Sequence, residues 1–429
     1  MAINIEPDVL VCGAGCAGIG AALSSARSGA KTLLIERAPF AGGIITTAGL
    51  PFFDGVARKK DGVIVTRGIP LELLVRMGVC KASDVTIKPH NPTIDNIERF
   101  KVEMDRMLLG EPNLQFLFHT FAAGVTRKKD RIEEVIVANK AGLVRLRPKT
   151  IIDTTGDADV AAHADAPLDT SREFMPMSLH FRVGNVVRNP ELSSRCRDVV
   201  IAAHKRGDIP SFYGPGVGFR FAEDEVYVHA IRVTADATNP EDLTRAEIQG
   251  RKDAWTMYQL WKEHVPGFEK SYYISSGPFI GIRESRRIAG KYVLTEDDIK
   301  AQRQFPDAIA TGCWYLDLHP SYATVGSANV APGAMGGLDG FQPSHYDIPY
   351  GALLPRKIEN LLVAGRCHSA NRMAASSTRV TATAMAMGEA AGTAAALATS
   401  LHKSVQELDG RKVRDALDAR HAGPYTGAA

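Results

Sequence analysis

Short apolar runs recur along this chain at intervals that predict an α/β fold. The run Val-Leu-Val at 9–11 is bounded by polar and glycine residues, as expected for a parallel strand buried on both faces. Apolar runs at 32–35, 150–153 and 358–364 have the same character and predict further strands of that sheet.

Helical and hairpin patterns lie between these runs. Residues 95–109 carry apolar side chains on one stripe and predict an amphipathic helix. Residues 113–121 predict a strand, and 135–138 with 142–146 predict a hairpin. The alanine-rich segment 376–399 predicts a long helix that begins near Ser376, where Ser and Thr would cap it.

The pattern changes near residue 166. Residues 175–185 and 225–234 alternate like strands of an antiparallel sheet, and 244–263 predicts a long helix. We therefore expect a separate α+β substrate or cap domain inserted into a discontinuous first domain. The predicted boundaries are 1–165 for the first part, which includes a loop-rich insertion at 50–95, then 166–335 for the cap and 336–429 for the second part.

The first strand is followed by a glycine pattern typical of dinucleotide sites. Gly13 permits the tight turn, Gly15 lets a pyrophosphate approach the backbone, and Gly18 lets the helix pack close to the strand. Glu36 ends the second strand, where a carboxylate can accept hydrogen bonds from a ribose. The helix N-terminus would hold the diphosphate, so this stretch predicts a dinucleotide site.

Bulk composition narrows the class of protein. Hydrophobic residues make up 45% of the 429 residues and charged residues 23%, as in soluble globular proteins. The net charge of +3 implies neither a nucleic-acid nor a membrane partner, and no signal segment or apolar span is evident. Six scattered cysteines form no zinc pattern, so we expect a cytoplasmic protein without a metal site.

Four motifs in one order resemble the FAD-dependent oxidoreductase family related to fumarate reductase flavoproteins. They are GAGCAG at 13–18 with Glu36-Arg37 and Gly42-Gly43, DTTGD at 153–157, GIRESRR at 281–287, and the segment from NLLVAGRCHS to STRV at 360–380. The resemblance implies a Rossmann-type, glutathione-reductase-like FAD-binding domain split by a substrate domain. It implies FAD as cofactor. No CxxxxC follows Gly43 and no second GxGxxG stands between strand and helix, so neither a redox disulfide nor an NAD(P)H domain is indicated.

Carried over by position, the resemblance implies a set of FAD-binding residues. They are Gly13, Ala14, Gly15, Cys16, Ala17, Gly18, Glu36, Arg37, Gly42, Gly43, Ile44, Ala122, Ala123, Thr154, Thr155, Gly156, Asp157, Gly365, Arg366, Ser377, Thr378, Arg379 and Val380. The helix N-terminus at Ser377 would stabilise charge on reduced flavin. Asp157 has two readings, a hydrogen-bond acceptor at the cofactor or an N-cap of the helix at 158–163. Arg379 also has two interpretations, since its side chain could face the flavin or form an ion pair.

Hydride transfer also needs a proton donor or acceptor near the flavin. The main candidates are Arg283, Glu284, His319 and His180, with Tyr350 and His368 as further options. Each also has a structural reading: an interdomain ion-pair network for Arg283 and Glu284, a loop position for His319, and a core position for His180.

The expected function is hydride transfer between a small organic substrate and flavin N5, with an electron acceptor or donor that the sequence leaves unidentified. The alternatives are a flavin-dependent oxidase or monooxygenase, an FAD-dependent RNA-modifying protein, and a non-catalytic FAD-holding subunit. The near-neutral net charge and the lack of a basic aromatic stripe argue against an RNA-modifying protein. Assembly into a homo-oligomer is left open.

Overall fold

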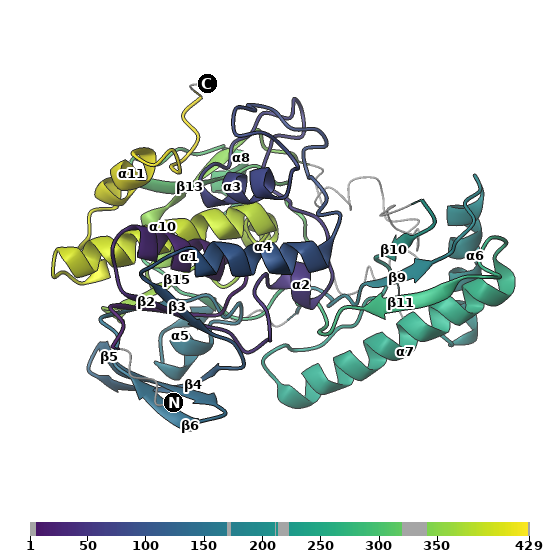
Figure 1. The fold of residues 1–429 in the computed structure, drawn as a ribbon, viewed down its shortest axis with the longest axis horizontal. Coiled ribbons are helices and arrows are strands. Elements are labelled where there is room, and N and C mark those ends of the chain that lie inside the picture. The colour runs from purple at the N-terminus through teal and green to yellow at the C-terminus, as the bar shows by residue number, and fades with distance from the viewer. Residues whose placement is uncertain (1–5, 170–172, 211, 213–222, 320–340, 428–429) are drawn as a thin grey trace.

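Two lobes of unequal size make up the protein in the computed structural model, which describes residues 6–169, 173–210, 212, 223–319 and 341–427. The larger lobe holds the N-terminal strand, the C-terminal helices and a parallel sheet (Figure 1). The smaller lobe holds α6 (Leu192–Arg206), α7 (Pro240–His264) and a short sheet.

A five-stranded parallel sheet is the framework of the larger lobe. Its order is β15-β7-β1-β2-β3, and each neighbouring pair is parallel. Its strands are β1 (Val9–Cys12), β2 (Thr32–Ile35), β3 (Leu114–Leu117), β7 (Thr150–Asp153) and β15 (Leu361–Val363). The sequence predicted a strand at each of these five places, although it extended the one at β3 to residue 121. The pairing brings the carboxyl ends of β1, β7 and β15 to one edge, where ligands of open α/β sheets bind.

Two small-residue helices pack closely on this sheet. These are α1 (Cys16–Arg27) and α10 (Thr381–Ser400). A Cβ added at Gly388 would lie 1.9 Å from the Ala17 carbonyl oxygen, and one at Gly392 would lie 2.2 Å from that of Ala21. This close approach requires glycine, and it holds α10 beside the helix that follows the phosphate turn.

The long helix begins later than the sequence predicts. Residues 376–378 belong to a separate helix, α9 (Arg372–Thr378), and α10 follows after Val380, whose side chain gives no cap. Ser377 is buried, and its Oγ donates to the Trp314 carbonyl at 2.6 Å. The predicted Ser and Thr caps are therefore wrong, because these side chains are already engaged in the interior.

An antiparallel sheet packs beside the main one. It consists of β4 (Phe121–Lys128), β5 (Arg131–Asn139) and β6 (Gly142–Leu146). The hairpin was predicted, but the single strand at 113–121 was not correct. The chain turns at His119, whose φ of 53° is left-handed, so β3 ends at Leu117 and β4 begins a new sheet.

The smaller lobe has its own core. Its sheet has the order β10-β9-β11 and is antiparallel, formed by β9 (Phe181–Gly184), β10 (Val226–Val228) and β11 (Tyr272–Ser276). Helix α7 begins at Pro240, four residues earlier than predicted, with Asn239 capping its first turn. Trp261 of this helix is fully buried and its ring stacks on Phe181 of β9.

The chain leaves and re-enters the larger lobe at one place, where β8 (Leu168–Asp169) pairs with β12 (Arg287–Ile288). The predicted cap boundary at 335 lies within 320–340, outside the described residues. However, β13 (Ala308–Gly312) and β14 (Tyr346–Pro349) pair with each other, and Ile309 and Ile348 pack in the core of the larger lobe. The cap is therefore shorter than predicted.

The remaining elements complete the larger lobe. They are α2 (Ile44–Thr47), α3 (Ile69–Arg76), α4 (Ile97–Leu109), α5 (Asp159–His163), α8 (Glu296–Lys300), α11 (Gly410–Asp418) and the 3-10 turns η3 (Tyr350–Leu353) and η4 (Val405–Glu407). Across the described residues, every helix is too short or too polar to cross a membrane.

Glu389 of α10 makes the stability of this lobe pH-dependent. It is buried, and its Oε2 accepts a hydrogen bond from the Ile69 N–H at 2.9 Å, at the start of α3. Burial raises the pKa of this carboxyl to about 8. The contribution of Glu389 to the free energy of unfolding is therefore fully present below the unfolded-state pKa near 4.5, and this contribution is lost as the pH rises through 8.

We expect Glu389→Gln to be more stable than the wild type above pH 5, because an amide accepts the same bond without a charge to bury. The gain should reach on the order of 2–3 kcal/mol by pH 7–8. Urea unfolding of both proteins between pH 5 and pH 8 measures it. A constant difference over this range would contradict the assignment.

Candidate active site

One cavity of about 770 Å³ extends from the carboxyl ends of the parallel strands to the cap lobe. Its volume is in the range of cofactor and substrate sites. One end is lined by the glycine turn and by the ends of β7 and β15. The other end is lined by histidine, arginine and aspartate side chains from the cap and from loops.

The phosphate turn is shaped for a ligand at Gly15 and for packing at Gly18. A Cβ added at Gly18 would lie 1.7 Å from the Gly13 carbonyl oxygen, so Gly18 permits the contact between helix and strand. A Cβ added at Gly15 would meet only the Gly43 Cα at 3.8 Å, and Gly15 lines the cavity. The space beside Gly15, at the N-terminus of α1, therefore suits a pyrophosphate.

Glu36 and Gly43 extend this end of the cavity. Glu36 follows β2, and its carboxylate accepts hydrogen bonds from the N–H groups of Ala14 at 2.6 Å and Ala38 at 2.8 Å. These bonds fix the carboxylate where a ribose would lie. Gly43 has a φ of 55° and lies so close to Gly15 that a Cβ would approach the Gly15 Cα to 2.7 Å.

Asp157 and Arg366 also line this end of the cavity. Arg366 donates to Asp157 Oδ1 at 2.7 Å and to Ser285 Oγ at 2.7 Å. Burial opposes ionisation of Asp157, yet the charge of Arg366 leaves its pKa below the usual value. Asp157 does not cap α5, because Asp153 accepts the Ala161 N–H instead.

Most of the predicted cofactor residues line this cavity. Those that do are Gly13, Gly15, Cys16, Ala17, Glu36, Arg37, Gly43, Ile44, Thr154, Thr155, Gly156, Asp157, Gly365, Arg366, Arg379 and Val380. The remaining ones are placed elsewhere among the described residues: Ala14, Gly18, Gly42, Ala122, Ala123, Ser377 and Thr378. Ala122 lies buried on β4, and Ser377 and Thr378 end the buried helix α9.

Arg283 lines the other end of the cavity. Its guanidinium donates to the Pro176 carbonyl at 2.7 Å and to Ser178 Oγ at 2.6 Å, and approaches His229 Nε2 to 3.0 Å. Arg232 bonds the same Ser178 hydroxyl. Burial and the charge of Arg232 lower the pKa of Arg283, and since a guanidinium stays protonated in proteins, this reflects a concentrated positive charge.

His180 lines the cavity and carries an unused hydrogen-bond acceptor. Its Nδ1 lies 3.1 Å from the Ala48 carbonyl, which assigns the proton to Nδ1. Its Nε2 is buried and has no hydrogen-bond partner among the described residues. Burial, reinforced by the charge of Arg283, lowers the pKa of His180 to about 3, so the ring is neutral at pH 7.

His319 is held by a carboxylate. Its Nε2 lies 3.0 Å from Asp317 Oδ1, and Arg379 donates to Asp317 Oδ2 at 2.9 Å. All three side chains line the cavity. Arg379 therefore forms an ion pair, and it does so within the cavity. Burial lowers the pKa of His319 to about 4 against the opposing effect of Asp317.

Glu284 was predicted as a catalytic residue, but it does not line this cavity. It is buried outside the described cavity lining, and its carboxylate pairs with Arg287 at 3.0 Å and Arg372 at 3.1 Å. Its role is structural. Tyr350, whose hydroxyl donates to the Val405 carbonyl, and His368, which bonds the Gly365 carbonyl, likewise lie in the interior.

The polar lining residues that the sequence did not reveal include Asp54, His229, Arg232 and Asp317. His229 and Arg232 interrupt the apolar alternation at 225–234, and that interruption was the available signal. Asp317 precedes His319 by two positions. Asp54 lies in the loop-rich insertion, where no local pattern distinguishes it.

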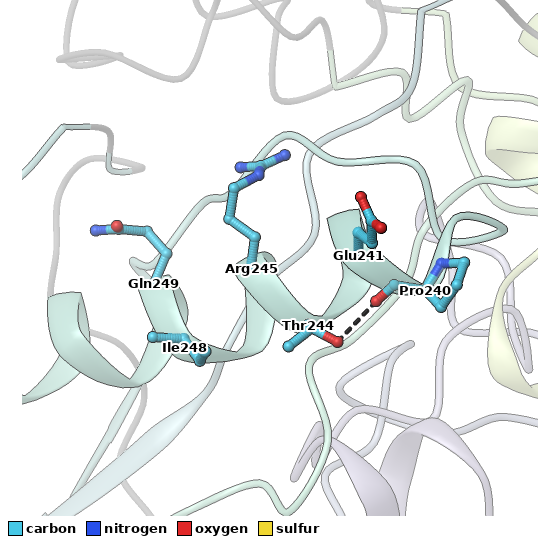
Figure 2. A pocket seen from close by; sticks show the side chains of 6 residues that line it. All are labelled: Pro240, Glu241, Thr244, Arg245, Ile248 and Gln249. Atoms are coloured by element: carbon cyan, nitrogen blue, oxygen red, sulfur yellow. Dashed lines mark hydrogen bonds between the residues drawn. The ribbon is translucent and has the colours of Figure 1, made fainter.

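A shallow hollow on the outer side of α7 differs from this cavity. Figure 2 shows its lining, which comes entirely from the N-terminal part of α7. The residues are Pro240, Glu241, Thr244, Arg245, Ile248 and Gln249. Their polar groups do not converge, and Thr244 Oγ1 is bonded to the Pro240 carbonyl.

The parallel sheet, the glycine turn and the acidic residue after β2 define a dinucleotide-binding α/β protein. The chain belongs to the FAD dependent oxidoreductase family, whose model matches residues 8–417. It is thus an FAD-dependent enzyme, and the space at Gly15 and Gly43 together with Glu36 fits the ADP part of that cofactor.

Among curated protein sequences, none matched. Three similar solved structures are a geranylgeranyl bacteriochlorophyll reductase-like protein from Thermoplasma acidophilum, a flavin-dependent brominase and p-nitrophenol 4-monooxygenase from Pseudomonas putida DLL-E4. They share 13%, 12% and 13% identity, with TM-scores of 0.46, 0.47 and 0.40. The alignments cover 96%, 97% and 97% of this chain and 83%, 83% and 84% of theirs.

Proposed function

We propose that this enzyme, with a glutathione-reductase-like FAD domain, transfers a hydride between flavin N5 and a small organic anion. Bound FAD supplies the redox chemistry, and the protein supplies binding, orientation and charge. The observation that carries the proposal is the continuous cavity, which joins the ADP end at Gly15 to the arginine and histidine cluster at Arg283.

The charge of the lining supports an anionic substrate. At the cap end, four basic side chains face two carboxylates in the described lining: Lys59, Arg232, Arg283 and Arg379 against Asp54 and Asp317. Asp317 is already paired with Arg379. The described hydrogen bonds of Arg283 go only to uncharged groups, so the charge of its planar guanidinium is available to bind a carboxylate.

The neutral groups beside this charge would orient the rest of the substrate. His180 Nε2 can accept a hydrogen bond from a hydroxyl or amino group, because its lone pair is buried and unused among the described residues. Trp314 and Tyr315 stack at 4.8 Å between ring centroids and line the cavity, giving it an apolar wall. A substrate packed against this wall would lose water around the reacting carbon.

Anaerobic reduction of the FAD enzyme tests this function. The panel contains 2-hydroxy acids, 2-amino acids, the amides of both, and pyridine nucleotides. We expect an acid to bleach the flavin absorbance at least 100-fold faster than its amide, because removing one charge from a buried charge-assisted pair costs several kcal/mol. Equal rates for acid and amide would contradict the anionic substrate.

Exposing the reduced enzyme to oxygen separates the alternatives. Stoichiometric hydrogen peroxide would indicate an oxidase, and oxygen in the product a monooxygenase. Persistence of reduced flavin would indicate a dehydrogenase with another acceptor.

A further inference from the structure

We propose that Asp54 exchanges a proton with the substrate while the flavin exchanges the hydride. This inference rests on the function proposed above and adds a residue outside every motif of the family resemblance. Asp54 lies in the loop-rich segment at 50–95, between two short bridges of that segment, and its side chain lines the cavity.

The backbone of Asp54 is anchored at the start of α10. Its carbonyl accepts the Ala382 N–H at 2.9 Å, in the first turn of that helix. The next residue, Gly55, lies so close to Val380 and Thr383 that a Cβ would approach their side chains to 2.7 Å. The position of the carboxyl group is therefore fixed by the large lobe, next to the helix N-terminus and to Arg379.

The carboxyl group has an unused oxygen. Asp54 Oδ1 is buried and lacks a hydrogen-bond partner among the described residues, and Asn91 binds the carboxyl group from its own segment. Buried polar atoms are rarely left unpaired, so an unpaired one on a residue that lines a ligand cavity indicates a group that a ligand completes. Asp54 is thus available to a substrate, whereas Asp317 is occupied by Arg379 and His319.

The surroundings of Asp54 place its titration in a useful range. Burial and the Asp317 carboxylate raise its pKa to about 7 against the opposing effect of Arg379. Tyr227 of β10 and Cys313 after β13 also face it. His180 and His319 of the same cavity lining have pKa values lowered to about 3 and about 4, so they stay neutral where Asp54 changes charge. A proton-exchanging group works best with a pKa near the working pH.

In oxidation of a hydroxyl or amino substrate, the C–H bond breaks, and bound FAD would be the two-electron oxidant that takes up its hydrogen as hydride. The O–H or N–H bond of the group attached to that carbon also breaks. Its proton binds the Asp54 carboxylate, and a C=O or C=N bond forms. Reduction runs the same transfers in reverse, with protonated Asp54 as the donor.

The test uses the FAD-loaded enzyme and the acid that bleaches wild-type flavin fastest. For Asp54→Asn we expect bleaching roughly 100-fold slower or more, with unchanged FAD content. The wild-type rate should rise with pH through about 7, because only the carboxylate accepts a proton, and the variant should lose this rise. Infrared titration should show a protonated-carboxyl band with a midpoint near pH 7 that Asp54→Asn lacks.

Two further variants separate a chemical role from a structural one. In Asp54→Ala, added formate should restore bleaching, because it supplies the missing carboxylate. Asp253→Asn is the matched control: Asp253 is buried on α7 away from the described cavity lining, its pKa is raised to about 6 by burial, and its loss should leave bleaching unchanged.

Each result decides the assignment. Wild-type bleaching rates or an unchanged pH profile in Asp54→Asn, an infrared band that survives the substitution, or no rescue by formate would overturn the role of Asp54 alone. If no acid of the panel bleaches the wild-type flavin, the proposed function fails and the role of Asp54 fails with it.

Discussion

Gly15→Val is expected to fold normally and to be purified almost free of FAD. The backbone at Gly15 has φ −70° and ψ −176°, which valine adopts without strain. An added Cβ meets only the Gly43 Cα at 3.8 Å, so the side chain would fill the space beside the N-terminus of α1. A pyrophosphate could then no longer reach the N–H groups of that turn, and we expect at least about a 100-fold loss of affinity.

Flavin absorbance relative to protein absorbance, and titration of the apoprotein with FAD, measure this effect. Gly15→Ala provides a graded control, because a single methyl group should weaken binding less. Gly18→Ala provides the opposite control: its Cβ would collide with the Gly13 carbonyl, so it should lower the melting temperature of the apoprotein. Full FAD occupancy in Gly15→Val would refute the placement of the pyrophosphate.

Arg283→Met is expected to retain FAD and to lose most of its activity toward the anionic substrate. The guanidinium is nearly buried and is held by the Pro176 carbonyl and Ser178, so it is preorganised for an anion. Removing a buried, hydrogen-bonded charge from a substrate contact should reduce kcat/KM roughly 10²–10³-fold, or about 3–4 kcal/mol.

Steady-state kinetics with the acid and its amide distinguish this role from a structural one. The wild type should prefer the acid, and Arg283→Met should lose that preference, because the amide never used the charge. Arg283→Lys should recover part of the activity, since lysine keeps the charge but lacks the planar fork. Unaltered preference for the acid in Arg283→Met would exclude Arg283 as the anion-binding residue.

The glycine turn and the acidic residue after β2 were predictable as one unit because their geometry is local. Gly13, Gly15 and Glu36 lie within 24 consecutive residues, and a strand-turn-helix-strand unit places them by short-range geometry. The parallel strands were predictable for a similar reason, since burial on both faces requires continuous apolar runs. The family resemblance extended this to Asp157 and Arg366, which the structure joins in an ion pair.

Errors arose where tertiary contacts competed with local propensity. Ser377 and Thr378 resemble helix caps, but both are buried at the end of α9, where Ser377 bonds Trp314 and Tyr346 and Thr378 bonds the Ala374 carbonyl. Glu284 lies one residue after Arg283 in a charged motif, yet Arg287 and Arg372 neutralise it in the interior. Sequence spacing does not distinguish a carboxylate that faces a cavity from one that neutralises two arginines.

The sequence by itself determined the cofactor class and the strand-turn-helix unit whose geometry fits the ADP part of that cofactor, because these depend on residue types at short spacing. The tertiary structure alone decided which side chains meet at the reaction end. Asp54, His229, Arg283 and Asp317 come from four segments of the chain, and packing of the cap lobe against the large lobe brings them to one cavity. No periodicity encodes that meeting, since it depends on the path of the chain between the lobes.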